Sequence, residues 1–139
     1  MNRFTDQERP DIPVAGIVYG DIIYWGTIIA AVIALIGSVV TFTTNAQYMD
    51  PGYLLSALWE GKDVETVWRE AVGAQPEGHW YLRELTTGNG LTMAGIALGV
   101  FIVVPGILGA AMVLFRERKP AFGVLALLAA GIAVFALIP

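Results

Sequence analysis

The feature that most constrains this chain is residues 91–115, a stretch without a single charged side chain. It ends at four charged residues in succession, Arg116, Glu117, Arg118 and Lys119. A helix needs about 20 apolar residues to cross the hydrocarbon core of a bilayer, and this stretch is long enough. It therefore predicts a membrane-spanning helix whose end is marked by a cluster of charge.

Two further uncharged stretches, residues 22–44 and 121–138, predict two more spanning helices. Charged residues make up only 14% of the chain, whereas soluble proteins carry about 25%. We therefore expect an all-α integral membrane protein with three transmembrane helices. The first apolar stretch is longer than the roughly 7–15 residues of a signal-peptide core, so we expect an uncleaved first helix.

The segment before the first span, residues 1–21, is expected to be a polar cytoplasmic lead-in. Pro10 and Pro13 disfavour a regular helix there, because proline lacks an amide proton and clashes with the preceding turn. Asp21 is expected to cap the first spanning helix, since a carboxylate suits the free amides and the positive dipole end of a first turn.

Residues 45–90 form the long connection between the first two spans, and two short helices are predicted within it. Asp50 followed by Pro51 is a helix-start signal, and Asp63 is expected to cap a second helix that ends at Gly73. Both helices have an apolar side and are too short to cross a bilayer, so we expect them at the membrane surface. Residues 86–90 are expected to form a flexible lead into the second span.

Small residues recur at helical spacing in the predicted spans, and such faces let helix backbones approach closely in lipid. The residues expected to pack against other helices, including those of partner subunits, are Gly26, Ala30, Ala34, Gly37, Gly95, Gly99 and Gly106. The alternative is that the spacing only reflects segments rich in alanine and glycine. Pro105 is expected to kink the second span, either as a hinge or as a static bend.

The distribution of lysine and arginine predicts the orientation. Arg116, Arg118 and Lys119 lie in the short loop, residues 116–120, and Arg3 and Arg9 lie in the lead-in, whereas the long connection is acidic overall. The positive-inside rule then places the N-terminus and the short loop in the cytoplasm, and the long connection and the C-terminus outside the cell (inner) membrane.

Four tryptophans lie at the start of the first predicted span or in the long connection, and aromatic rings favour the boundary between lipid and water. The residues expected to serve as interfacial anchors are Trp25, Trp59, Trp68 and Trp80.

Little chemistry is available to the predicted spans. They contain no Asp, Glu, Lys, Arg or His, and hydroxyls such as those of Ser38, Thr41 and Thr92 are expected to bond back to their own helix. The chain has no cysteine, and its one histidine, His79, is interpreted as a solvated interfacial residue. We therefore expect no catalytic, cofactor-binding or metal-binding residue, and no enzyme activity of the chain alone. The net charge of −4 argues against nucleic acid as a partner.

These features favour a non-catalytic accessory or structural subunit of a larger membrane complex, with an energy-conversion or redox assembly, and thus electron transport, as the first choice. Its expected partners are other integral membrane subunits and membrane lipid, and a lipid or a quinone can occupy its helix grooves. On this hypothesis Gly99→Leu abolishes co-purification with a partner. A homo-oligomeric channel or small-molecule exporter component is the alternative, with Pro105 as its gate, and a transient assembly factor is a third possibility.

Overall fold

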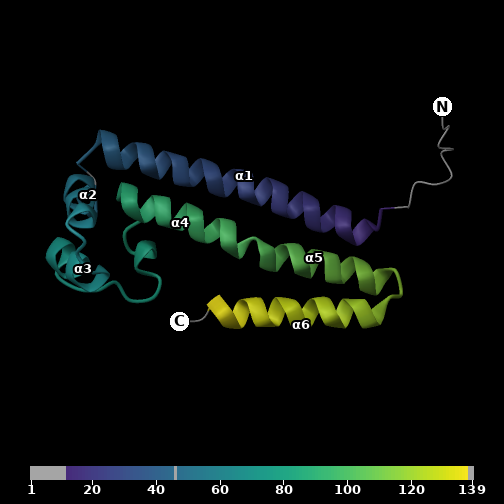
Figure 1. The fold of residues 1–139 in the computed structure, drawn as a ribbon. Helices are drawn as coiled ribbons and strands as arrows, with labels where there is room; N and C mark the ends of the chain where they lie inside the picture. The colour runs from purple at the N-terminus through teal and green to yellow at the C-terminus, as the bar shows by residue number, and fades with distance from the viewer. Residues whose placement is uncertain (1–11, 46, 138–139) are drawn as a thin grey trace, which may run out of the picture. The chain divides into compact units, whose positions relative to one another are not determined.

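The computed structural model describes residues 12–45 and 47–137, and all of its regular structure is helical (Figure 1). Three stretches in it are helical, long and apolar enough to cross a membrane: Val14–Thr43, Gly88–Arg116 and Pro120–Leu137. The prediction of an all-helical chain with three such helices is therefore confirmed. Most of the lead-in, with Arg3 and Arg9, lies outside the described residues, as does Ile138.

The first long helix, α1 (Val14–Thr43), begins earlier than the sequence predicts. The carbonyl of Pro13 accepts the first helical hydrogen bonds, from the amides of Gly16 at 2.9 Å and Ile17 at 3.3 Å. Proline is compatible with a helix start because the first amides have no partner in any case. Asp21 consequently lies inside α1, and the prediction that it caps the helix is wrong.

The second apolar stretch consists of two helices, α4 (Gly88–Phe101) and α5 (Val103–Arg116), separated at Ile102. Pro105 follows one turn later and has no amide proton to donate to the carbonyl of Phe101. The start of α4 also differs from the prediction. Thr87 caps it by accepting from the amide of Gly90 at 3.1 Å, so residues 88–90 are helical and do not form a flexible lead.

The chain divides into two compact units, and the first contains residues 14–24 of α1, α5 and α6 (Pro120–Leu137). In it, α5 and α6 lie side by side as an antiparallel pair (Figure 1). A side chain at Gly123 would meet the ring of Phe115 at 2.9 Å, and one at Gly106 would meet Ile23 at 3.1 Å. Small residues therefore allow the close approach of helices in this unit.

The tight turn between α5 and α6 carries the charged cluster. Arg118 has a positive φ of 58°, and its amide donates to the carbonyl of Phe115 at 3.1 Å, while that of Lys119 donates to Leu114 at 2.9 Å. This pattern is a Schellman motif, which ends a helix and usually places glycine at the left-handed position. Lys119 also pairs with Glu117 at 2.9 Å.

The second unit contains residues 25–45 and 47–102, and in it α1 and α4 approach closely at glycines. A side chain at Gly95 would lie 2.5 Å from the amide nitrogen of Ala34, and one at Gly37 would overlap the backbone of Thr92. Gly88 likewise lies directly against Thr41. Substituting any of these three glycines therefore forces the two helix backbones apart.

Candidate ligand pocket

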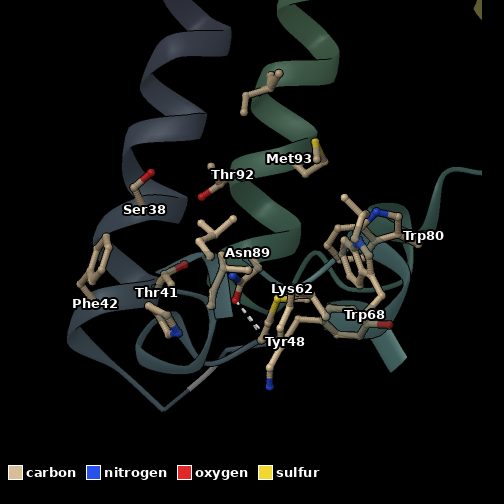
Figure 2. A pocket seen from close by; sticks show the side chains of 17 residues that line it. Ser38, Thr41, Phe42, Tyr48, Lys62, Trp68, Trp80, Asn89, Thr92 and Met93 are labelled. Atoms are coloured by element: carbon tan, nitrogen blue, oxygen red, sulfur yellow. Dashed lines mark hydrogen bonds between the residues drawn. The ribbon is translucent and has the colours of Figure 1, made fainter. Parts of the chain in front are cut away.

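The second unit holds a pocket of about 430 Å³ where α1 ends and α4 begins (Figure 2). Two short helices of the long connection, α2 (Pro51–Trp59) and α3 (Val64–Val72), complete its wall. Most of its lining is apolar and consists of Phe42, Met49, Pro51, Leu54, Leu58, Val64, Val67, Met93 and Ile96. The remaining lining residues are Ser38, Thr41, Tyr48, Lys62, Trp68, Trp80, Asn89 and Thr92.

The caps of α2 and α3 hold these short helices in place. Asp50 accepts from the amides of Gly52 at 3.2 Å and Tyr53 at 3.1 Å, so α2 begins as the sequence predicts. Asp63 accepts from the amide of Thr66 at 3.4 Å, and Gly73 ends α3 with a φ of 87°. The predicted start of α2 and the predicted start and end of α3 are therefore confirmed, because they depend on local capping signals.

Asn89 ties the connection after α1 to the first turn of α4. Its side-chain oxygen accepts from the amide of Tyr48 at 2.9 Å and from that of Met49 at 3.4 Å (Figure 2). These two donors fix the orientation of the carboxamide. Within the described residues, its nitrogen Nδ2 makes no hydrogen bond, so Asn89 brings two unused protons to the pocket lining.

Three hydroxyls occupy the helix side of the pocket (Figure 2). Ser38 donates to the carbonyl of Ala34 at 2.9 Å, Thr41 to that of Gly37 at 3.0 Å, and Thr92 to that of Gly88 at 2.9 Å. The expectation that these side chains bond back to their own helix is thus confirmed, although Thr92 also donates to the carbonyl of Ala34 in α1 at 3.5 Å. Each hydroxyl has one proton, which it donates to a helix carbonyl. Its oxygen can therefore only accept a further hydrogen bond.

A charged network fixes α2 against α3 at the rim. Lys62 donates to Glu70 at 2.8 Å and lies 3.4 Å from Glu60, and the hydroxyl of Tyr53 also donates to Glu70 at 2.8 Å. Hydrogen bonds from Lys62 and Tyr53 lower the pKa of the Glu70 carboxyl. The hydrogen bond from Lys62 to Glu70 raises the pKa of Lys62. Desolvation raises the pKa of Tyr53, and the hydrogen bond from Tyr53 to Glu70 raises it further. The Lys62 ammonium is therefore already neutralised by two carboxylates.

An aromatic cluster forms the opposite side of the pocket. The rings of Tyr48 and Trp80 stack with centroids 4.7 Å apart, and Trp68 meets Trp80 edge-on at 5.7 Å. These two tryptophans, predicted as interfacial anchors, thus belong to a packed cluster. The other two predicted anchors have large exposed fractions, 88% for Trp59 and 62% for Trp25.

The predicted helix-packing residues have neighbours within their own units. Ala30 and Ala34 of α1 face Gly95 of α4, Ala30 also lies near Gly99, and a side chain at Gly26 would overlap Ile102. The partner-facing role that the sequence suggests for these positions therefore competes with contacts inside the chain.

Sequence reasoning did not single out the pocket or Asn89. Asn89 stands between Gly88 and Gly90, and such a stretch is typical of a flexible loop. What distinguishes it is the contact across 41 residues with Tyr48, which no local pattern reveals. His79 packs edge-on against Tyr81 at 5.8 Å, and no cluster of potential metal ligands occurs in the described ranges.

Together these features define an all-helical protein with three helices that are long and apolar enough to cross a membrane, and with a mostly apolar pocket beside two of them. The chain belongs to a protein family whose model matches residues 15–139. It is 32% identical over 115 residues to an uncharacterized protein from Archaeoglobus fulgidus, across 81% of this chain and 75% of that protein. No solved structure matches the chain.

Proposed function

We propose that this chain is a non-catalytic integral membrane protein that acts as an accessory subunit of a larger membrane complex and holds an amphiphilic molecule in its pocket. The pocket is the observation that carries the proposal. Its volume of about 430 Å³ falls in the usual range for small-molecule sites, about 300–1,000 Å³. A mostly apolar lining with polar groups confined to a few positions suits a molecule with an apolar chain and a small polar head.

The lining supports binding and does not suggest a reaction. Lys62 is its one charged residue and is paired with Glu60 and Glu70. The hydroxyls of Ser38, Thr41 and Thr92 donate to backbone carbonyls, and among the described residues none of them donates to a side chain that could act as a base. We therefore assign the pocket a structural or carrier role within the complex, for a lipid or a quinone in an energy-conversion or redox assembly.

The outer face of α6 is the surface that we assign to partner subunits. Leu125, Ile132 and Phe135 lie on it with exposed fractions of 60%, 71% and 78%, whereas Ala130 is buried. In contrast to the glycines of α1 and α4, these side chains are largely exposed in the part of the chain that the structure describes. Helices in lipid associate through close van der Waals contact, for which such a face is available.

The alternative of a homo-oligomeric channel has less support. It requires a pore wall built from small residues and backbone, but Gly37, Gly88 and Gly95 are covered by neighbouring helix segments of the same unit. A symmetric oligomer that conducts ions in liposomes would nevertheless favour it over the accessory role.

The accessory role is tested by photo-crosslinking in native membranes. A photoreactive residue in place of Leu125 should crosslink to one partner protein at defined stoichiometry, whereas the same residue in place of Glu117, in the turn, serves as the control. Crosslinking of Leu125 to lipid alone would contradict the accessory role and leave the pocket proposal to be judged by ligand binding.

The orientation proposed from the positive-inside rule is tested with single cysteines, since the chain contains none. Glu117→Cys should be protected from a membrane-impermeant thiol reagent in intact cells, and Ser56→Cys should be labelled. The reverse pattern would place the Arg116–Lys119 turn outside.

A further inference from the structure

We infer that the pocket selects an uncharged amphiphile whose polar head carries a hydroxyl group, in preference to an ether or a charged head of the same chain length. This inference rests on the pocket assigned above and specifies the class of its ligand. It follows from three properties of the lining: which hydrogen-bond donor is free, which acceptor is free, and how the charged groups at the rim are paired.

The free donor is the side-chain nitrogen of Asn89. Its oxygen is held by the amides of Tyr48 and Met49, so the carboxamide cannot turn over without leaving both amides unpaired. The ligand head must therefore accept a hydrogen bond at this point. Carbonyls, ethers and hydroxyls all meet this first requirement.

The free acceptor is the hydroxyl oxygen of Ser38, whose proton is donated to the carbonyl of Ala34. The hydroxyl oxygens of Thr41 and Thr92 also belong to the lining, but they lie against Gly88 and Gly37 in the contact between α1 and α4. These three oxygens stand on the same side of the pocket, with Trp68 and Trp80 across from them (Figure 2). A head that only accepts leaves the Ser38 oxygen without a donor once water is displaced, whereas a hydroxyl can accept from Asn89 and donate to Ser38. The second requirement thus removes ethers and ketones.

The rim charge disfavours an ionised head. Lys62 lies 2.8 Å from Glu70 and 3.4 Å from Glu60, so one cation already has two anions. A carboxylate or phosphate head would enter an environment without a free cation, and a charged group without a partner is costly to desolvate. An ammonium head would be attracted by the one excess negative charge of this group, but it would have to displace Lys62 and Tyr53 from the carboxylates that already hold them.

The experiment compares four probes with the same twelve-carbon chain: dodecanol, dodecyl methyl ether, dodecanoate and dodecylammonium. Binding to the full chain in a neutral detergent is followed through the fluorescence of Trp68 and Trp80, in a Trp25→Phe, Trp59→Phe background that removes the other tryptophans. Dodecanol should bind about fivefold or more tightly than its methyl ether and than either ion. Equal affinities for dodecanol and the ether, or tighter binding of an ion, would overturn the inference.

Two variants locate the preference. Asn89→Asp keeps an oxygen for the amides of Tyr48 and Met49 but removes the free donor, and Ser38→Ala removes one acceptor. Each should weaken dodecanol binding several-fold, and Ser38→Ala should leave the ether unaffected because the ether donates no proton. Thr43→Val is the matched control, since Thr43 donates to Val39 in the same way at 2.7 Å and lies outside the lining. A loss with Thr43→Val as large as that with Ser38→Ala would contradict the assignment.

The hydroxyl group can belong to an aromatic head or to an aliphatic lipid alcohol. To distinguish the two, the affinities of a quinol and of the quinone with the same side chain are measured in the same way. A quinol that binds more tightly than dodecanol identifies an aromatic head, and one that binds more weakly identifies an aliphatic lipid alcohol. Both results support the inference, whereas tighter binding of the quinone than of its quinol overturns it. If none of the probes binds, the proposed pocket function itself fails; if all bind without preference, only the hydroxyl rule fails.

Discussion

The side-chain oxygen of Asn89 accepts a hydrogen bond from the backbone amide of Tyr48 at 2.9 Å, and this bond joins segments 41 residues apart. The same oxygen accepts from the amide of Met49 at 3.4 Å. One side chain thereby fixes the start of the long connection against the first turn of α4. It also aligns the aromatic side of the pocket, because Tyr48 stacks on Trp80.

Asn89→Leu should destabilise the chain by about 1–3 kcal/mol, because it leaves the amides of Tyr48 and Met49 without their acceptor. Asn89→Asp is the control, since it keeps an oxygen at this position and should cost clearly less. Thermal unfolding in detergent, followed by circular dichroism, measures both. If the two variants lose the same stability, the hydrogen bonds to Tyr48 and Met49 do not contribute as described.

Gly95 and Gly99 lie four residues apart in α4 but should respond differently to alanine. A methyl group at Gly95 would lie 2.5 Å from the backbone nitrogen of Ala34, whereas one at Gly99 would make an ordinary contact, 3.5 Å from the methyl group of Ala30. Gly95→Ala should therefore cost about 1–3 kcal/mol, and Gly99→Ala should be nearly neutral. The same unfolding assay compares them, and equal losses would contradict the described helix contact.

Some parts of the fold are determined by short stretches of sequence, and others are not. The caps at Asp50, Asp63 and Gly73 follow from short-range rules, and so do the three long apolar helices. The start of α4 was mispredicted because glycine signals flexibility in sequence, while Gly88 lies here in close backbone contact with Thr41. The pocket could not be predicted, because it depends on which helix faces meet.

The rim network should make the attachment of α2 to α3 depend on pH at both extremes. Because the pKa of Glu70 is lowered in the folded chain, ionised Glu70 stabilises the fold at a pH above its pKa in the unfolded chain, about 4.3. This stabilisation is lost as the pH falls through the pKa in the folded chain. The raised pKa values of Lys62 and Tyr53 mean that theirs is present below about pH 10 and is lost as the pH rises.

Hydrogen exchange of the α3 amides should therefore be slowest between about pH 5 and 10, after correction for the intrinsic rates. Glu70→Gln should remove most of the increase in the exchange rate at acid pH, which we call the acid limb. A smaller part should remain, because hydrogen bonds from Thr66 also lower the pKa of the Asp63 cap. An acid limb that is unchanged in Glu70→Gln would exclude Glu70 as its source.

Arg118→Gly should stabilise the chain by about 1 kcal/mol. Arg118 occupies the left-handed position of the Schellman motif with a φ of 58°, where a side chain is strained and glycine is not. Arg116→Gly, inside the last turn of α5, is the contrasting variant and should be destabilising. A destabilised Arg118→Gly would mean that its side chain makes a contribution larger than the strain at this position.

The central claim is that the pocket beside Asn89 binds an amphiphile, and dodecanol titration of the Trp25→Phe, Trp59→Phe chain tests it most directly. We predict a saturable change in the fluorescence of Trp68 and Trp80. We also predict that Ser38→Leu, which fills the pocket, abolishes this change, whereas Thr43→Leu, outside the lining on the same helix, leaves it intact. A signal that never saturates, or that survives Ser38→Leu unchanged, would contradict the claim.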